Sequence, residues 1–365
     1  MWSLRPISYS ALSGWKDDDH GAALAAFQRQ ALKPIDERYK TGSIGITPAA
    51  FDPVIALSQK PEAIKNPRHF FEDNFSAYKL VCHDEKRGQV TGFYEPEVDA
   101  QRGSDAQFAT PLLRRPDDLI VLNESNRPST LSEDYRFGRR DGNGNIVEYY
   151  DRAAINRGAI DVDDLAIAWI KDPVDAFFIH VQGAARLNMG NGETIRITYD
   201  GKSGHPFTAI GKNLIERGEI AKDQISMQSI RAWLSKNPDQ SRALMEENRS
   251  YIFFKEAPSI NENLGPIAAA KVPLTAERSL AVDRLIHTFG TPIFVQADTV
   301  NNAPFQHLMI AQETGTAIVG PSRGDIFFGS GELAGEKAGA VNSLCDFTIL
   351  VPHGIGFDEA GVQLP

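Results

Sequence analysis

Short runs of β-branched and aromatic residues, each closed by a turn-forming residue, constrain the fold of this chain more than any other feature. Gly, Pro, Asn or Asp bound most of them. The runs are GQVTGFYEPEV, AFFIHVQG, TIRITYDG, YIFFKE, TPIFVQAD, FQHLMIAQ, TAIVG and DIFFG. Such runs are typical of β-strands, and many short strands with tight turns favour barrels over a doubly wound sheet. The sequence therefore predicts a mainly β protein with some α-helix.

Three tracts predict helices, because apolar residues recur in them at helical spacing: residues 22–33, 61–75 and 224–238. The segment from about residue 100 to 250 differs from the rest, because it begins with charged, loop-rich sequence and later carries helices. We therefore expect an outer domain, residues 1–98 and 252–365, interrupted by an inserted domain, residues 99–251.

Composition limits the class of protein. The 365 residues are 42% hydrophobic and 24% charged, which suits about two soluble domains. No apolar run approaches the roughly 18 residues of a membrane-spanning helix. The net charge of −10 argues against nucleic acid or an anionic membrane surface as the main partner. The start, MWSLRPISYS, lacks the basic head and apolar block of an export signal.

Metal and cofactor motifs are not found in the sequence. Cys82 and Cys345 form no CxxC pair, and we expect two separate, partly buried thiols; a disulfide between them or a reactive site is left open. The eight histidines show no paired-ligand spacing, so no metal site is predicted. The GKS at 201–203 is no phosphate loop, because Arg196 occupies the position of the required glycine. No cofactor is expected.

Three polar clusters stand out. VTGFYEPEV (90–98) alternates Thr91, Phe93 and Glu95 with Gly92 and Tyr94. FIHVQGAARL (178–187) presents Gln182, Gly183 and Arg186 after apolar residues that we expect to form a strand. AQETGTAIVGPSRGD (311–325) sets Glu313, Arg323 and Asp325 around glycine turns. Each cluster could also be an ordinary half-buried strand or turn.

Taken in order, TGFYEPEV, HVQGAARL, YDGKSGHPFTAIGKNL, YIFFKE, VPLTAERSLAVD and AQETGTAIVGPSRGDIFFGSGELAGEKAG resemble the membrane-bound lytic murein transglycosylase A family. The resemblance implies a double-psi β-barrel domain interrupted by a second β-rich domain, with a glycan groove between them. The C-terminal part is similar to the 3D domain, which is named for three aspartates. Asp283 and Asp325 match that pattern, whereas Glu313 stands where the family has aspartate.

The resemblance implies cleavage of the β-1,4 bond between N-acetylmuramic acid and N-acetylglucosamine by one acid, Asp325, with a 1,6-anhydromuramic product. That acid must begin protonated. An apolar wall such as Ile326–Phe328 would raise its pKa, and Arg323 would lower it unless a turn at Gly324 separates the two. The substrate-binding candidates are Thr91, Tyr94, Gln182, Gly183, Arg186, Asp283 and Glu313. Asp283 could instead position the surroundings of Asp325.

Two other functions remain open: a β-1,4-glycan hydrolase that uses Glu313 or Asp283 as a second acid, and a non-catalytic peptidoglycan-binding protein. The expected partners are peptidoglycan glycan strands and other cell-wall enzymes, with no nucleic acid. The expected location is the periplasm or the outer-membrane side of the cell envelope. No cysteine precedes Cys82, so the sequence gives no support for a lipid anchor. Oligomeric state is left open.

Overall fold

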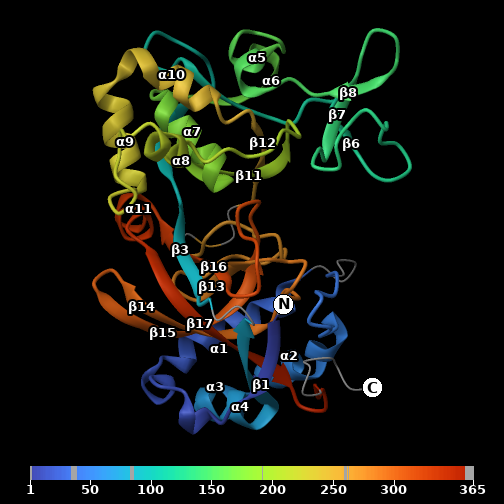
Figure 1. Ribbon diagram of the computed structural model, residues 1–365, viewed down its shortest axis with the longest axis vertical. Helices are drawn as coiled ribbons and strands as arrows, with labels where there is room; N and C mark the ends of the chain where they lie inside the picture. Colours follow the sequence, from blue (N-terminus) through green and yellow to red (C-terminus); the bar gives the residue numbers. More distant parts are fainter. Residues whose placement is uncertain are drawn as a thin grey trace. The chain divides into compact units, whose positions relative to one another are not determined.

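The computed structural model describes residues 2–33, 39–82, 86–190, 192–258, 261 and 263–357 (Figure 1). The chain divides into two compact units, and each is described by itself. Unit 1 comprises Met1–Tyr94, Asn261–Gly329 and Leu333–Pro365, and unit 2 comprises Glu95–Ile260 and Ser330–Glu332. The domain limits given by the sequence stay a prediction.

Unit 1 is built on a closed barrel. The strand order β3–β17–β14–β15–β13–β16 returns to β3, so these strands leave no open edge among themselves. Their bounds are β3 (Gly88–Glu95), β13 (Ser279–Val282), β14 (Pro292–Val300), β15 (Ala303–Glu313), β16 (Arg323–Ser330) and β17 (Asn342–Pro352). β2 (Phe75–Cys82) continues the sheet from β17, and β1 (Trp2–Pro6) pairs with β2. The mainly β class predicted from the sequence is confirmed.

Short helices complete unit 1. They are α1 (His20–Gln28), α2 (Asp52–Ser58), α3 (Pro61–Lys65), α4 (Pro67–Asn74) and α11 (Glu332–Gly339), whose first residue belongs to unit 2. The single helix predicted over 61–75 is two helices, because Asn66 precedes Pro67 and leaves the helical region at φ −135°. The helix predicted over 22–33 continues from Arg29 to Leu32 as a 3₁₀ turn.

Unit 2 contains a six-stranded sheet in the order β12–β11–β10–β4–β9–β5. The bounds are β4 (Glu97–Gln101), β5 (Thr110–Leu113), β9 (Ala166–Ile170), β10 (Ala184–Asn188), β11 (Thr194–Lys202) and β12 (Ile252–Ala257). A bridge between Arg114 and Phe254 brings the two ends of this sheet together. A smaller sheet joins β6 (Ile120–Val121), β7 (Phe137–Arg140) and β8 (Ile146–Glu148).

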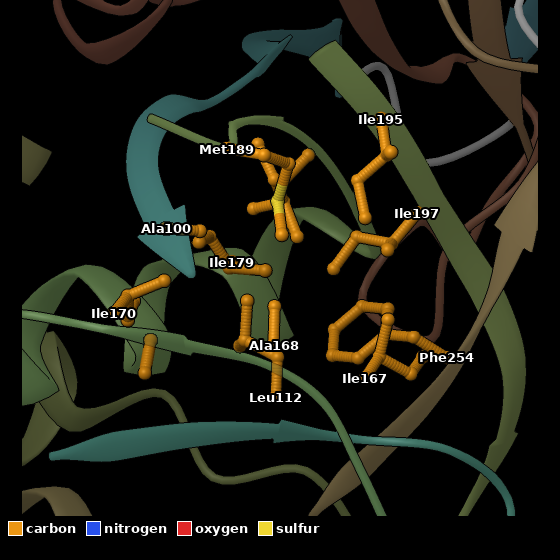
Figure 2. Packing of buried hydrophobic residues seen from close by; sticks show 13 residues of the cluster. Ala100, Leu112, Ile167, Ala168, Ile170, Ile179, Met189, Ile195, Ile197 and Phe254 are labelled. Carbon is orange, nitrogen blue, oxygen red and sulfur yellow. The ribbon is translucent and has the colours of Figure 1, made fainter. Parts of the chain in front are cut away.

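One hydrophobic cluster of unit 2 lies between this sheet and a helix that spans residues 173–182. Figure 2 shows Ala168 and Ile170 of β9, Ile197 of β11 and Ile179 of the helix among the packed side chains, and all four are buried. Each fully buried aliphatic side chain of the size of leucine or isoleucine contributes about 1.5–3 kcal/mol. Arg186 of β10 and Arg196 of β11 lie on strands that contribute side chains to this cluster.

The helices of unit 2 are α5 (Arg152–Asn156), α6 (Val162–Leu165), α7 (Pro173–Gln182), α8 (Ile210–Glu216), α9 (Met227–Lys236) and α10 (Pro238–Glu246). The strand predicted for AFFIHVQG is wrong, because this run forms most of α7. Asp172 caps the helix by accepting a hydrogen bond from the Val174 amide at 2.7 Å, Pro173 starts it, and Gly183 ends it in the left-handed region. Phe177, Phe178, Ile179 and His180 are all buried, so the run shows no helical stripe.

Other sequence-based expectations have clear outcomes. TAIVG was expected to be a strand, but residues 316–320 form a turn and loop in which the Ile318 amide bonds to the Gly315 carbonyl. Cys82 and Cys345 are not joined in a disulfide, as expected. Among the described residues, no helix combines the length and apolar character required to cross a bilayer.

Candidate active site

Asp325 lies on β16 and contacts a hydroxyl from the neighbouring barrel strand. Thr91 of β3 donates its Oγ1 proton to Asp325 Oδ1 at 2.6 Å. In the described part of the chain, no protein donor bonds to the other carboxyl oxygen, Oδ2. One oxygen of the acid is therefore fixed by the barrel, and the second is available to another molecule.

No turn at Gly324 separates Arg323 from Asp325, because β16 already begins at Arg323. A Cβ at Gly324 would lie 2.8 Å from the ring of Phe347 and 3.0 Å from Leu280, so this position must be glycine for the strand to pack against its neighbours. Arg323 and Asp325 consequently lie on the same face of β16.

Arg323 reaches Asp325 through Thr91 rather than directly. Its Nη2 donates to Thr91 Oγ1 at 2.8 Å, and no Arg323–Asp325 ion pair forms among the described residues. Burial raises the pKa of Asp325 to about 6, while the Thr91 hydrogen bond and the Arg323 charge act in the opposite direction. Desolvation outweighs the cation, so the neutral acid is accessible close to neutral pH.

The apolar wall beside Asp325 differs from the expected one. Ile326 pairs with Leu280 and points away from the face of Asp325, whereas Phe327 shares that face. Phe327 packs against Phe93 of β3 at a ring-centroid distance of 5.2 Å and against Ala268 and Leu274.

Asp283 holds the segment that leads into β16. Its Oδ2 accepts from the Gly320 amide at 2.9 Å, and its Oδ1 accepts from the Leu285 amide at 3.0 Å. His287 donates from Nε2 to the Pro321 carbonyl at 2.7 Å, and burial lowers the pKa of His287 to about 4, so the ring is neutral. Of the two roles that the sequence left open for Asp283, these contacts favour the positioning role.

Glu313 is a second carboxyl on the same barrel, and it is half-buried. Its two oxygens accept from the amides of Ala269 at 3.1 Å and Thr314 at 2.8 Å. Burial raises the pKa of Glu313 to about 7 against the effect of these hydrogen bonds and of Lys271. Ala281 of β13 is paired with Glu313 on one side and Asp325 on the other, so the two acids are two strand spacings apart, roughly 10 Å.

The remaining predicted site residues lie in both units. Tyr94 is buried in unit 1, and a Cβ at Gly335 of α11 would be 2.8 Å from its ring. In unit 2, Gln182 is the last residue of α7, and Gly183 caps that helix at φ 79°. The structure brings Thr91 and Asp325 into contact, and it places Gln182, Gly183 and Arg186 along one helix-to-strand connection.

Sequence reasoning missed a buried ionic cluster in unit 2. Glu95 is 1% exposed; its Oε1 is 2.6 Å from Arg196 Nε, and its Oε2 is 3.0 Å from Arg186 Nε. Ser330 donates its hydroxyl to the same Oε2 at 2.6 Å. One signal could have revealed the cluster: Arg196 stands between Ile195 and Ile197 in a strand, where a charged residue requires a partner.

Within the described ranges, no group of three or more His, Cys, Asp or Glu residues is arranged to hold a metal ion. The groups that the site does present are the Asp325 carboxyl, the Thr91 hydroxyl and the Arg323 guanidinium.

Comparison with known families finds two matches along the chain. The MltA specific insert domain matches residues 89–255, and the 3D domain matches residues 278–351. Membrane-bound lytic murein transglycosylase A of Escherichia coli K12 is 32% identical over 263 residues, which is 70% of this chain and 63% of that protein. Its namesake in Vibrio cholerae is 29% identical over 266 residues. The match thus spans less than two thirds of these relatives.

Solved structures match over much more of the chain. The membrane-bound lytic murein transglycosylase from Agrobacterium tumefaciens is 44% identical with a TM-score of 0.87, and the match covers 96% of this chain and 98% of that one. E. coli MltA with bound chitohexaose is 25% identical with a TM-score of 0.71 over 96% and 94% of the two chains. The predicted fold class, a double-psi β-barrel interrupted by a second β-rich region, is confirmed. Because the identity extends over nearly all of both chains, this protein belongs to the membrane-bound lytic murein transglycosylase A family.

Proposed function

We propose that this protein is a lytic transglycosylase that cleaves the β-1,4 bond between N-acetylmuramic acid and N-acetylglucosamine in peptidoglycan. Relatives named lytic murein transglycosylase support the reaction, and the E. coli structure with chitohexaose supports a glycan as the ligand. The observation that carries the proposal is the carboxyl of Asp325, which Thr91 holds by one oxygen and whose pKa burial raises to about 6.

In the proposed reaction, neutral Asp325 gives its proton to the glycosidic oxygen as the bond from that oxygen to C1 of the muramic acid breaks. The C6 hydroxyl of the same sugar attacks C1, and its proton passes to the Asp325 carboxylate. The products are a free 4-hydroxyl on one strand and a 1,6-anhydro ring on the other. The carboxyl returns to its starting state, so a single acid completes the cycle.

A second carboxylate is unnecessary when the substrate carries its own nucleophile. Glycosidases that use water need a second carboxylate to activate it or to attack the sugar. A hydroxyl tethered in the same ring can have an effective molarity on the order of 10⁵ M or more, which replaces much of that assistance.

We further propose that Thr91, Tyr94, Gln182, Gly183 and Arg186 contribute to glycan binding, as the family resemblance implies. Thr91 does so beside the acid. Space above Gly183 is open, since a Cβ there would meet nothing within 4 Å, and a sugar could approach this backbone closely. Asp283 and Glu313 are proposed to shape the loops around the site through their hydrogen bonds to backbone amides.

The test is digestion of purified murein followed by mass spectrometry of the products. We expect 1,6-anhydromuramic ends from the wild-type protein and a loss of at least about 10²-fold in their rate of formation with Asp325→Asn. Asp298→Asn, which changes an exposed aspartate of the same unit, is the matched control and should retain activity. A protein that binds murein but produces no new ends would be a binding module, which would contradict the proposal.

A hydrolase is the second candidate, and the position of Glu313 favours it. A separation of roughly 10 Å between strands is close to the carboxyl spacing that inverting hydrolases use for a water molecule. Digestion in heavy-oxygen water separates the two reactions, because hydrolysis adds the label to the new reducing ends whereas anhydro products contain none.

Location and partners follow from the proposed substrate. The curated relatives are named membrane-bound proteins. Since peptidoglycan lies outside the cytoplasmic membrane, we propose the periplasm or the outer-membrane side of the envelope as the place of action.

Glycan strands are the proposed partners, with other cell-wall enzymes acting on the same strands. Fractionation of cells with an antibody against the protein would test the location.

A further inference from the structure

Arg323 makes a contact that the reaction described above does not use. Its guanidinium lies on the face of β16 that carries Asp325, and its Nη2 donates to Thr91 Oγ1 at 2.8 Å. Nη1 donates to the Gly324 carbonyl and, at 3.5 Å, to the Gln89 carbonyl of β3. Arg323 thus bridges the two barrel strands that supply the acid and its hydroxyl partner.

The contact determines the direction of the Thr91 hydrogen bond. A threonine hydroxyl has one proton to donate, and its oxygen can also accept. A guanidinium can only donate, so Thr91 accepts from Arg323 and must direct its own proton to Asp325 Oδ1. Oδ1 is then an acceptor in both states of the acid. When the carboxyl is neutral, its proton is left on Oδ2.

The charged surroundings of Asp325 are simple. Arg323 is the charged group that acts on the carboxyl, Thr91 of β3 is neutral, and Ala281 is the residue paired with it on β13. The cation stands one hydroxyl away and forms no ion pair with the acid among the described residues. A direct ion pair would hold the carboxyl in its charged form, whereas an indirect contact can orient the acid and leave its proton exchangeable.

We propose that Arg323 is a positioning residue that acts through Thr91: it fixes the Thr91 hydroxyl as a donor to Asp325 Oδ1 and so reserves Oδ2 for the acid proton. The inference rests on the proposed function only where it assigns Asp325 as the acid. The hydrogen-bond relay, from Arg323 through Thr91 to Asp325, can be tested without any measurement of activity.

The first experiment follows the Asp325 carboxyl by carbon-13 NMR titration in four proteins: wild type, Thr91→Val, Arg323→Met and the double variant. Each single change should raise the pKa of Asp325, because Val removes the donor and Met removes the cation that orients it. The through-space effect of the Arg323 charge stays in the Thr91→Val background, whereas any part that acts through Thr91 is lost. The pKa rise caused by Arg323→Met should therefore be smaller in that background. An equal effect in both backgrounds, or none in either, overturns the proposal.

Controls separate the relay from general damage. Arg68→Met removes another partly exposed arginine of unit 1 and should leave the Asp325 titration unchanged. Arg323→Lys keeps the charge and one donor, and Thr91→Ser keeps the hydroxyl, so each should restore a near wild-type titration. If Arg323→Met fails to fold, the lysine and serine variants still test the relay, and a titration in Thr91→Ser that matches Thr91→Val overturns it.

Kinetics on murein give an independent readout. Arg323→Met should lower kcat by about ten- to a hundred-fold with KM little changed, because a misoriented acid slows proton transfer and leaves substrate binding intact. A rise in KM with kcat unchanged would contradict the positioning role. If the wild type forms no anhydro ends at all, the proposed function fails, and the NMR cycle still decides the relay.

Discussion

The pKa of Asp325 links the chemistry of the site to the stability of the fold. In the folded protein, burial raises this pKa from 3.8 to about 6. A carboxyl whose folded pKa is raised contributes stability below its unfolded pKa, and this contribution is lost as the pH rises through the folded value. Above about pH 6 the charge on Asp325 therefore lowers the stability of the fold, at the residue that we propose as the catalytic acid.

Asp325→Asn should consequently stabilise the protein at high pH, since the amide resembles the neutral acid and can still accept from Thr91. At 1.36 kcal/mol per pKa unit, the gain is about 3 kcal/mol at most near pH 8 and about 1 kcal/mol near pH 4.5. Urea unfolding at the two pH values measures it. Asp298, whose pKa the Arg87 hydrogen bond lowers, is the control, and Asp298→Asn should give no such gain. A gain independent of pH would refute the explanation.

The helix α7 shows what local sequence can and cannot decide about an element. Its signals are Asp172 and Pro173 at the start and Gly183 at the end, and all three are present in the sequence. The apolar run between them suggested a strand, because residues buried on most sides give neither a helical nor an alternating pattern. Strands with one solvent-facing side, such as β3, were predictable from their alternating residues, and β3 ends at Glu95, directly before Pro96.

Gly183 is the residue whose replacement tests this element. Its φ of 79° is strained for other residues, and a Cβ there would meet nothing within 4 Å. The cost of replacing it therefore comes from the backbone conformation alone. Gly183→Ala should lower the free energy of unfolding by about 1 kcal/mol, and Gly183→Asn by less, because asparagine tolerates this region better. Urea denaturation measures both. Gly103→Ala, another open position but without a positive φ, should be nearly neutral.

On the scale of the whole molecule, the sequence could not predict which residues far apart in the chain come into contact. The order of motifs was enough to predict the family and the barrel, and it supplied Asp325 as the candidate acid. Thr91 and Arg323 are 232 residues apart, and Glu95 and Arg196 are 101 residues apart, so no local pattern connects them. These contacts depend on which strands become neighbours. The closed strand order of unit 1 decides the first pair, and the packing of β10 and β11 decides the second.

The Glu95 cluster lies where the chain enters unit 2 for the first time and, at Ser330, for the second. The Gly331 amide also donates to the Glu95 carbonyl at 2.9 Å, so the two entry points are bonded to each other. Removing the Glu95 carboxylate would leave Arg186 and Arg196 without this counter-charge in a buried setting. The loss of stability should therefore be greatest in β4, β10 and β11, the strands next to this cluster.

Glu95→Ala should lower the free energy of unfolding by about 3–5 kcal/mol, which is the usual cost of breaking a buried ion pair from one side. Hydrogen–deuterium exchange read by mass spectrometry should show the largest acceleration in β4, β10 and β11, with the barrel strands β14 and β15 little changed. Glu97→Ala removes an exposed carboxylate two residues along the chain and should stay within about 0.5 kcal/mol of wild type. Uniform acceleration across both units, or a loss no larger than that of Glu97→Ala, would show that the cluster does not hold the two entry points together.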